Sequence, residues 1–419
     1  MTDPQDLLRR LFARAVAVAD PMQSLAAHLP ERPAGRVVVV GAGKASARMA
    51  EAVEAAWGPC EGLVITRYGY ARSCRGIEIV EAAHPVPDAA GMGATARMLR
   101  LLEGLGEGDM VLALISGGAS ALLVQPAGAM TLAEKQAVNA ALLASGAPIG
   151  EMNLLRKHLS RVKGGQLAAA AYPAQMLALL ISDVPGDDPA MIGSGPTVGE
   201  ASTPAEARAI VARYAIALPP SAEAVLSGPT GVVAPGDPRL GRVRNVIYAA
   251  PSQSLAAAAD LAREVGLRVE NLGDDLEGEA REVARDHARR ALNIQAGLAP
   301  GHAPVLLLSG GELTVTRRGN GVGGPNAEYA LALARALGGA AGLHAIACDT
   351  DGVDGAAEVA GAVIGPDTLA HAARAGVDPD AALARNDAHS FFAAIGGQVV
   401  TGPTLTNVND FRAILIAPA

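Results

Sequence analysis

The chain has 419 residues, half of them hydrophobic and only 18% charged, so it is long enough for two or three domains with large cores. Its formal net charge is −8 without a basic block, which argues against nucleic-acid binding. The three cysteines lie far apart, at Cys60, Cys74 and Cys348, and provide neither disulfide nor metal-ligand spacing. No signal peptide or membrane-length apolar run is evident, so we expect a cytoplasmic protein without membrane contact.

Strand-like apolar runs alternate with helical patterns along most of the chain, which is typical of a parallel sheet covered by helices. The first unit is the apolar run 36–40, then a glycine-rich turn at 41–46 and an alanine-rich helix. Further strands are predicted at 62–66, 77–80, 109–115 and 175–181. Helices are expected to begin near Thr131, with a capping box to Glu134, and at Thr203, which precedes a proline suited to the first helical position.

A domain boundary is predicted within 227–242, which contains Gly and Pro and has little periodicity; a long loop is the alternative. We place the domains at 1–240 and 241–419. After this stretch the alternation of strands and helices restarts. The strands expected there are 245–248, 267–269, 304–308, 344–348 and 412–416, and a charged, solvated helix is expected from about Glu277.

The turn Gly41-Ala-Gly43-Lys44-Ala-Ser46 lies where a helix N-terminus and backbone amides favour an anion. It is not a P-loop, because Val38 stands where that motif has Gly. It is also not a full dinucleotide fingerprint, since the third Gly is Ser46 and the next strand ends in Arg67 rather than an acid. A reductase is weakened but not excluded, because Arg67 would suit a 2′-phosphate. The candidate anion-binding residues are Gly41, Gly43 and Lys44, and a purely structural turn is the alternative.

Two more small-residue turns follow buried strands, at 116–120 and 309–311. Small residues let the backbone approach a ligand, and hydroxyls and amides donate to phosphate or carboxylate. A plain strand-to-helix turn is the alternative, and neither segment has the Gly-x-Ser-x-Gly pattern of a hydrolase. The candidate binding residues are Ser116, Gly117, Gly118, Ser120, Ser309, Gly310 and Gly311.

Two acidic clusters also follow predicted strands, Asp183 with Asp187 and Asp188, and Asp351 with Asp349 and Asp354. Carboxylates there suit Mg²⁺, which takes one or two of them together with substrate phosphates. Asp183, Asp187 and Asp351 are the predicted metal ligands, and Asp183 and Asp351 join Lys44 as predicted catalytic residues. Helix capping and turn formation are the alternative roles.

A local basic segment runs from Arg156 to Lys163 in this acidic chain. Part of it must be a solvated face, and the other reading is a pocket for an anionic substrate, with Arg156 and Lys163 as binding residues. His84 lies in a loop beside Pro85 and Pro87, where a structural role is favoured over that of a base.

Taken together, these motifs resemble the class II glycerate 2-kinases, the MOFRL family, whose members are often labelled hydroxypyruvate reductases. The resemblance covers nearly the whole chain. The matching segments are 41–46, Ala83–Asp88, Ser116–Leu122, Arg156–Ser160, Lys163–Gly165, Ser182–Pro189, Gly193–Thr197, Thr350–Gly355, Asn386–Asp387, Thr401–Pro403 and Thr406–Asp410.

The resemblance implies an α/β protein with a Rossmann-like N-terminal domain, a mostly parallel sheet, and a smaller MOFRL-type α/β C-terminal domain. It implies ATP-dependent phosphorylation of D-glycerate to 2-phosphoglycerate, with Mg²⁺, in a cleft between the domains. The family's functional lysine falls on Lys44. Its arginine, in a Gly-Gly-Arg-Asn segment, is replaced here by Pro325, beside Asn326, which we count as a binding residue. Arg317 and Arg318, on a predicted strand, are the nearest cations to replace it.

Two other functions stay open at this point. One is an NAD(P)H-dependent hydroxypyruvate reductase, and the other is a non-catalytic protein that binds a sugar acid. The partner expected in every case is a small molecule, D-glycerate above all, and neither nucleic acid nor membrane. The sequence leaves the oligomeric state open, with a homodimer as one option.

Overall fold

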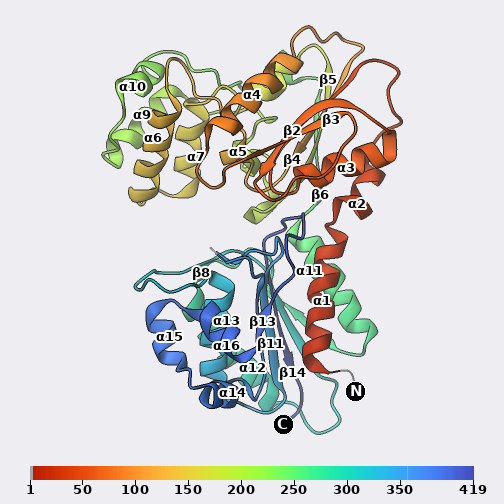
Figure 1. Cartoon of the computed structure of the whole chain (residues 1–419), viewed down its shortest axis with the longest axis vertical. Coiled ribbons are helices and arrows are strands. Elements are labelled where there is room, and N and C mark those ends of the chain that lie inside the picture. The colour runs from red at the N-terminus through yellow and green to blue at the C-terminus, as the bar shows by residue number, and fades with distance from the viewer. Residues whose placement is uncertain (1–2, 356) are drawn as a thin grey trace. The chain divides into compact units, whose positions relative to one another are not determined.

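The computed structural model describes residues 3–355 and 357–419, which divide into two compact units (Figure 1). One unit comprises residues 21–248, and the other comprises 1–20 together with 249–419. This division differs from the predicted domains 1–240 and 241–419 in its boundary and in the first helix, which belongs with the C-terminal residues. Among the described residues, no helix is both long and apolar enough to span a bilayer.

The sheet of residues 21–248 has six strands in the order β3-β2-β1-β4-β5-β6. The strands are β1 (Val37–Ala42), β2 (Glu61–Arg67), β3 (Ile77–Ala82), β4 (Met110–Ile115), β5 (Gln175–Ile181) and β6 (Val243–Ala249). The pairings that join β3 through to β5 are all parallel, as the alternating pattern predicts. The chain order reverses between β1 and β4, so the carboxyl ends of these two strands flank the position where open α/β sheets bind ligands.

The helices of this unit cover the sheet and also form a separate helical cluster. They are α2 (Pro21–Ser24), α3 (Ser46–Trp57), α4 (Ala89–Leu101), α5 (Ala119–Leu122), α6 (Leu132–Ala144), α7 (Ile149–His158), α8 (Gln166–Ala171), α9 (Pro204–Arg213) and α10 (Pro220–Leu226), with short 3-10 turns at Leu25–His28, Pro185–Asp187, Ile192–Ser194 and Pro238–Leu240. Helices α6, α7, α9 and α10 pack around their own apolar core, which includes Val138, Leu142, Leu155 and Ile210. The capping boxes at Thr131 and Thr203 are present as predicted.

The sheet of the other unit is mixed rather than parallel, and its strand order is β13-β12-β11-β14-β9-β7. The strands of this unit are β7 (Arg268–Asn271), β8 (Gly278–Glu279), β9 (Val305–Ser309), β10 (Leu313–Thr314), β11 (Leu343–Asp349), β12 (Gly361–Ile364), β13 (Gln398–Val399) and β14 (Asp410–Ile416). Among the described pairings of this unit, only β7–β9 and the separate two-stranded sheet β8–β10 are parallel, and β14 runs antiparallel to both of its neighbours. The alternation of strands and helices restarts here as expected, but the sheet is mixed, because the last strand inserts between β9 and β11 in the opposite direction.

Helices cover both faces of this second sheet (Figure 1). They are α1 (Pro4–Val18), α11 (Pro251–Glu264), α12 (Ala280–Ala296), α13 (Pro325–Leu337), α14 (Thr368–Ala375), α15 (Pro379–Arg385) and α16 (Ala388–Ile395). α1 and α11 pack on one face, where the rings of Phe12 and Phe411 are 5.8 Å apart, and α12 and α13 pack on the other. Burial of one apolar face of α1 against this sheet explains why the first helix belongs with the C-terminal residues.

Candidate active site

The two loops at the reversal point of the N-terminal sheet are tied directly to each other. The amide of Lys44, after β1, donates to the carbonyl of Gly117, after β4, at 2.8 Å. Ser116 Oγ accepts from the amide of Ala45 at 3.0 Å. A Cβ at Gly41 would lie 2.4 Å from the carbonyl oxygen of Leu114, and one at Gly43 would lie 2.1 Å from Ser116 Oγ. These two glycines therefore allow the loops to approach each other.

The amides of the first loop are all used within the protein. Gly43 N donates to Ile65 O at 3.1 Å, and Ser46 N donates to Gly43 O at 3.2 Å, while Lys44 and Ala45 donate to the second loop. In a dinucleotide or P-loop site, the corresponding amides face phosphate instead. The backbone cradle that the sequence suggested at 41–46 is thus not formed here, and the side chain of Lys44 is the group that a ligand would meet.

Lys44 and His84 converge over Gly118, which has φ +81°. A Cβ at Gly118 would lie 3.1 Å from His84 Nε2 and Cδ2 and 3.3 Å from Lys44 Cγ. Glycine is therefore required at this position for two reasons, its backbone conformation and the lack of space for a Cβ. The sequence favoured a structural role for His84, whereas the structure brings its ring to a cavity wall beside Lys44.

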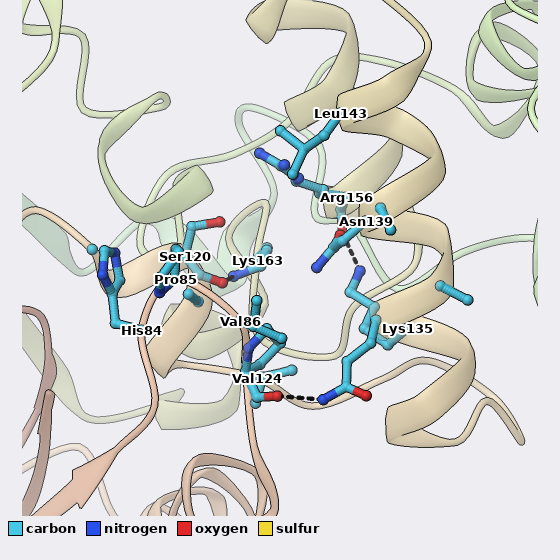
Figure 2. A pocket seen from close by; sticks show the side chains of 16 residues that line it. His84, Pro85, Val86, Ser120, Val124, Lys135, Asn139, Leu143, Arg156 and Lys163 are labelled. Atoms are coloured by element: carbon cyan, nitrogen blue, oxygen red, sulfur yellow. Dashed lines mark hydrogen bonds between the residues drawn. The ribbon is translucent and has the colours of Figure 1, made fainter. Parts of the chain in front are cut away.

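This cavity has a volume of about 610 Å³ and lies wholly within residues 21–248 (Figure 2). Its polar or small lining residues are His84, Gly118, Ser120, Lys135, Gln136, Asn139, Arg156 and Lys163. Its apolar lining residues are Pro85, Val86, Pro87, Ala121, Val124, Ala137, Ala140 and Leu143. Four predicted binding residues, Gly118, Ser120, Arg156 and Lys163, thus come together, and sequence reasoning missed the contributions of α6.

Three cations, Lys135, Arg156 and Lys163, line the cavity, and we call them its floor. Lys163 Nζ donates to the carbonyls of Ser120 at 2.8 Å and Leu123 at 3.1 Å. Lys135 Nζ, on α6, donates to the carbonyls of Leu159 at 3.3 Å and Arg156 at 3.5 Å. Both lysines are almost fully buried, with exposed fractions of 1% and 2%. Their ammonium groups donate hydrogen bonds to backbone carbonyls instead of forming ion pairs with carboxylates.

Burial changes the proton affinity of these lysines. Loss of hydration, together with the charge of Arg156, lowers the pKa of Lys135 to about 7. Loss of hydration also lowers the pKa of Lys163 well below its ordinary range, with the charges of Lys135 and Arg156 adding to the effect. Lysines with strongly shifted pKa values in a cavity are a recognised feature of functional sites.

Hydrogen bonds connect this floor to the second loop. Arg156 Nη1 donates to Asn153 Oδ1 at 3.2 Å, and Ser194 Oγ lies 3.5 Å from the same oxygen. The hydroxyls of Ser194 and Ser120 are 2.9 Å apart. The positions of three segments, α7, the turn at 192–194 and the second loop, are therefore fixed relative to one another, which pre-organises the groups that a ligand would contact.

The rest of the basic segment has other roles, so only part of it forms the cavity. Lys157 forms a buried ion pair with Glu200 at 2.6 Å. His158 contacts the hydroxyls of Thr230 at 2.6 Å and Ser202 at 3.1 Å. Arg161 is exposed, as expected for a solvated position.

The predicted acidic residues of this unit lie in the loop that follows β5. Asp183 and Asp187 are both partly buried, and Asp187 Oδ1 is a buried atom without a hydrogen-bond partner. Within the described residues, no group of three or more His, Cys, Asp or Glu could by itself hold a metal ion. An unpartnered, buried carboxylate oxygen nevertheless fits Mg²⁺, which usually takes only one or two carboxylates and completes its shell with phosphate oxygens and water.

The other predicted residues belong to the second unit, and most of them are buried in its hydrogen-bond network. Arg412 donates to the carbonyls of Gly310 and Gly311, and its Nε lies 3.4 Å from Ser309 Oγ. Asn326 is fully buried. Its Nδ2 donates to Asp410 Oδ1 at 2.7 Å. Burial raises the pKa of Asp410 to about 7.

Asp351 is fully buried, and its Oδ1 accepts from the amide of Val353 at 2.8 Å, which is a turn-forming contact. Asp354 accepts from the amides of Asn326 and Ala327 at the start of α13. The turn and capping contacts that the sequence left as alternatives are therefore present in this acidic cluster. Its predicted metal ligand, Asp351, lies in a different unit from Asp183 and Asp187.

Pro325, which replaces the family's arginine, is the first residue of α13, a position where a missing N–H costs little. Arg317 and Arg318 follow β10, which ends at Thr314, so the predicted strand does not extend to them. Arg317 donates to the carbonyls of Gly319 and Gly321 in its own loop. Arg318 instead lines a hollow with Arg281, Arg285 and Arg335.

Comparison with known proteins identifies both halves of the sequence. A family model described as a domain of unknown function, DUF4147, matches residues 7–227, and the MOFRL family model matches residues 305–410. A D-glycerate 2-kinase from Thermotoga maritima is 36% identical over 422 residues, covering 99% of this chain and all of that protein. A crystal structure of a glycerate kinase from the same organism superposes with a TM-score of 0.89, at 36% identity and with 99% of each chain covered.

A protein from Agrobacterium vitis is 55% identical over 418 residues, covering 98% of this chain and 94% of that protein. It carries the name "Putative hydroxypyruvate reductase". The names of similar proteins thus divide between a kinase and a reductase, and the geometry of the site bears on that choice.

Proposed function

Because the chain belongs to the class II glycerate 2-kinase family, the MOFRL family, we propose that it transfers the terminal phosphoryl group of ATP to the 2-hydroxyl of D-glycerate. The observation that carries this proposal is the cavity at the sheet reversal point, whose floor has three cations and whose lining has no Asp or Glu. Both substrates are anions, and phosphoryl transfer depends mainly on positioning and charge neutralisation.

Lys44 and His84 are the residues we place at the reacting atoms. The ammonium of Lys44 would stabilise the charge that develops on the transferring phosphoryl group. His84, across Gly118 from Lys44, would accept the proton of the attacking hydroxyl as the new P–O bond forms and the bond to the nucleotide diphosphate breaks. Ser120 and the glycines before it would orient the phosphate, because small side chains leave the backbone accessible.

Asp183 and Asp187 would hold a divalent metal together with the phosphates of the nucleotide. When bound, Mg²⁺ supplies positive charge that neutralises the phosphate oxygens. Asp187 Oδ1 has no protein partner to lose by such binding. The roles of Asp351, Asn326 and the turn 309–311 stay predictions from the sequence.

The reductase function receives no support from the first loop, because the amides of 43–46 are already bonded within the protein. Ser46 is also fully buried, and its Oγ donates to the carbonyl of Leu114 at 2.9 Å. A dinucleotide pyrophosphate would need those amides to face it. The reductase activity that this name suggests is therefore best tested in parallel with the kinase activity.

Purified protein should form 2-phosphoglycerate from D-glycerate only when ATP and Mg²⁺ are both present. The measurement is a coupled assay of ADP release with chemical identification of the phosphorylated product. The parallel assay follows oxidation of NADH and NADPH with hydroxypyruvate. Turnover in the second assay without turnover in the first would overturn the proposed function.

The two acidic residues after β5 should set the Mg²⁺ requirement. We expect Asp183→Asn and Asp187→Asn each to raise the Mg²⁺ concentration for half-maximal activity severalfold, because each removes a hard anionic ligand. Asp188→Asn is the matched control in the same loop, where Asp188 Oδ1 accepts from the amide of Ala190 at 2.9 Å. Equal Mg²⁺ dependence in all three variants would remove this loop from the metal site.

A further inference from the structure

The three cations of the cavity floor, Lys135, Arg156 and Lys163, have no anionic partner in the part of the chain that the structure describes. Among the described residues, none of the three forms an ion pair, and none of the sixteen residues lining the cavity is acidic. Burying a cation costs several kcal/mol unless an opposite charge or several hydrogen bonds offset the cost. The carbonyl and amide oxygens that these side chains contact compensate only in part. A ligand that brings several negative charges would complete this site.

The cavity is also lined by exposed apolar side chains. Val86 and Leu143 are large hydrophobic residues with exposed fractions of 60% and 68%, and both line the cavity. Figure 2 shows them around the same space as the cations, with Asn139 between Leu143 and Lys135. Exposed apolar side chains beside buried cations suit a ligand that has a flat ring at one end and phosphates at the other.

The charge and the size of the two substrates decide which of them fits this cavity. D-glycerate has one negative charge and only three carbons, whereas a nucleoside polyphosphate has several charges and a ring system. A volume of about 610 Å³ is within the range that holds drug-sized ligands and far exceeds the needs of a three-carbon acid. Asn139 adds a buried Oδ1 without a partner, and its amide offers the donor and acceptor that a base edge requires.

We propose that this cavity is the nucleotide site, with the phosphate chain on Lys135, Arg156 and Lys163 and the base against Val86 and Leu143. This inference rests on the proposed kinase function and assigns one of its two substrates to a defined place. The phosphate chain extends toward Gly118, so its terminal group comes to Lys44 and His84. D-glycerate then lies outside the cavity, on the far side of that terminal phosphate.

Proton uptake provides a signature of this arrangement. Because the pKa of Lys135 is about 7 without a ligand, much of this lysine is neutral at about pH 8. Phosphates beside it would favour the charged form and raise its pKa, so binding should draw protons from the buffer. The amount of uptake is measured by calorimetry in two buffers that differ in ionisation enthalpy.

The test compares two probes, ADP and inorganic tripolyphosphate, by titration calorimetry on the full chain. Lys135→Met removes charge but keeps length, and it should weaken both probes tenfold or more and reduce proton uptake. Leu143→Ser should weaken ADP severalfold but leave tripolyphosphate unchanged, because only ADP has a base. The matched controls are Arg161→Met, an exposed cation of the same basic segment, and Ile149→Ser, an exposed apolar residue that does not line the cavity.

The possible outcomes separate this inference from the proposed function. If both probes bind normally to Lys135→Met and Leu143→Ser while the KM for D-glycerate rises, the cavity holds the acid and the inference is wrong. If the probes depend on these residues but no kinase turnover is found, the nucleotide site stands and the proposed function fails. Because Leu143 is exposed, its replacement keeps the test valid even where Lys135→Met does not fold.

Discussion

We expect Lys44→Ala to lower kcat by on the order of 10² or more while the protein stays folded. A cation that meets charge developing in the transition state contributes mainly to kcat, because its interaction strengthens as the reaction proceeds. The fold should persist because the amide of Lys44, which an alanine keeps, joins the two loops at 2.8 Å. Steady-state kinetics with thermal unfolding of both proteins provides the measurement.

Arg161→Ala is the matched control for charge, since Arg161 is an exposed cation in the same unit. It should retain near wild-type kcat and KM. A well-folded Lys44→Ala variant with near-normal kcat would show that residues 41–46 only form a tight turn. An equal loss in both variants would point to a general effect of net charge on substrate binding.

Much of the N-terminal fold was predictable because its signals are local. Apolar runs bounded by glycine-rich turns fix the strands, and Thr131 and Thr203 mark helix starts through their own side chains. The direction of β14 was not predictable in this way, since a short apolar run does not indicate whether the strand pairs parallel or antiparallel with its neighbours. The sequence also did not predict which unit α1 belongs to. Its leucines show that one face of the helix is buried, but not which sheet covers that face.

The candidate site was predicted in part for a similar reason. Lys44 and Gly118 were each predicted from a glycine-rich turn that follows an apolar strand, and the parallel pairing of β1 with β4 brings these two turns together. Lys135 was missed because a helical lysine is usually solvated. A signal was nevertheless present, since Lys135 shares the buried face of α6 with Val138 and Leu142. A lysine on an apolar helix face requires a partner or a ligand.

Gly118→Ala should reduce kcat by about tenfold to a hundredfold, with a loss of stability of about 1 kcal/mol from the positive φ. The new Cβ would lie 3.1 Å from the ring of His84 and 3.3 Å from Lys44 Cγ, which is closer than normal packing allows. Both side chains must therefore shift by a few tenths of an ångström, and misplacement of reacting groups is costly. The measurement is kcat at saturating substrate together with the free energy of unfolding.

The backbone penalty of this substitution has to be separated from its effect on the site. Gly146 has φ +72°, close to the +81° of Gly118, but a Cβ there would meet no atom within 4 Å. Gly146→Ala should therefore show the same loss of stability, about 1 kcal/mol, with normal kcat. If both alanine variants lose stability equally and both keep wild-type kcat, then the close approach of His84 and Lys44 over Gly118 has no part in catalysis, and the proton acceptor must be sought among other residues.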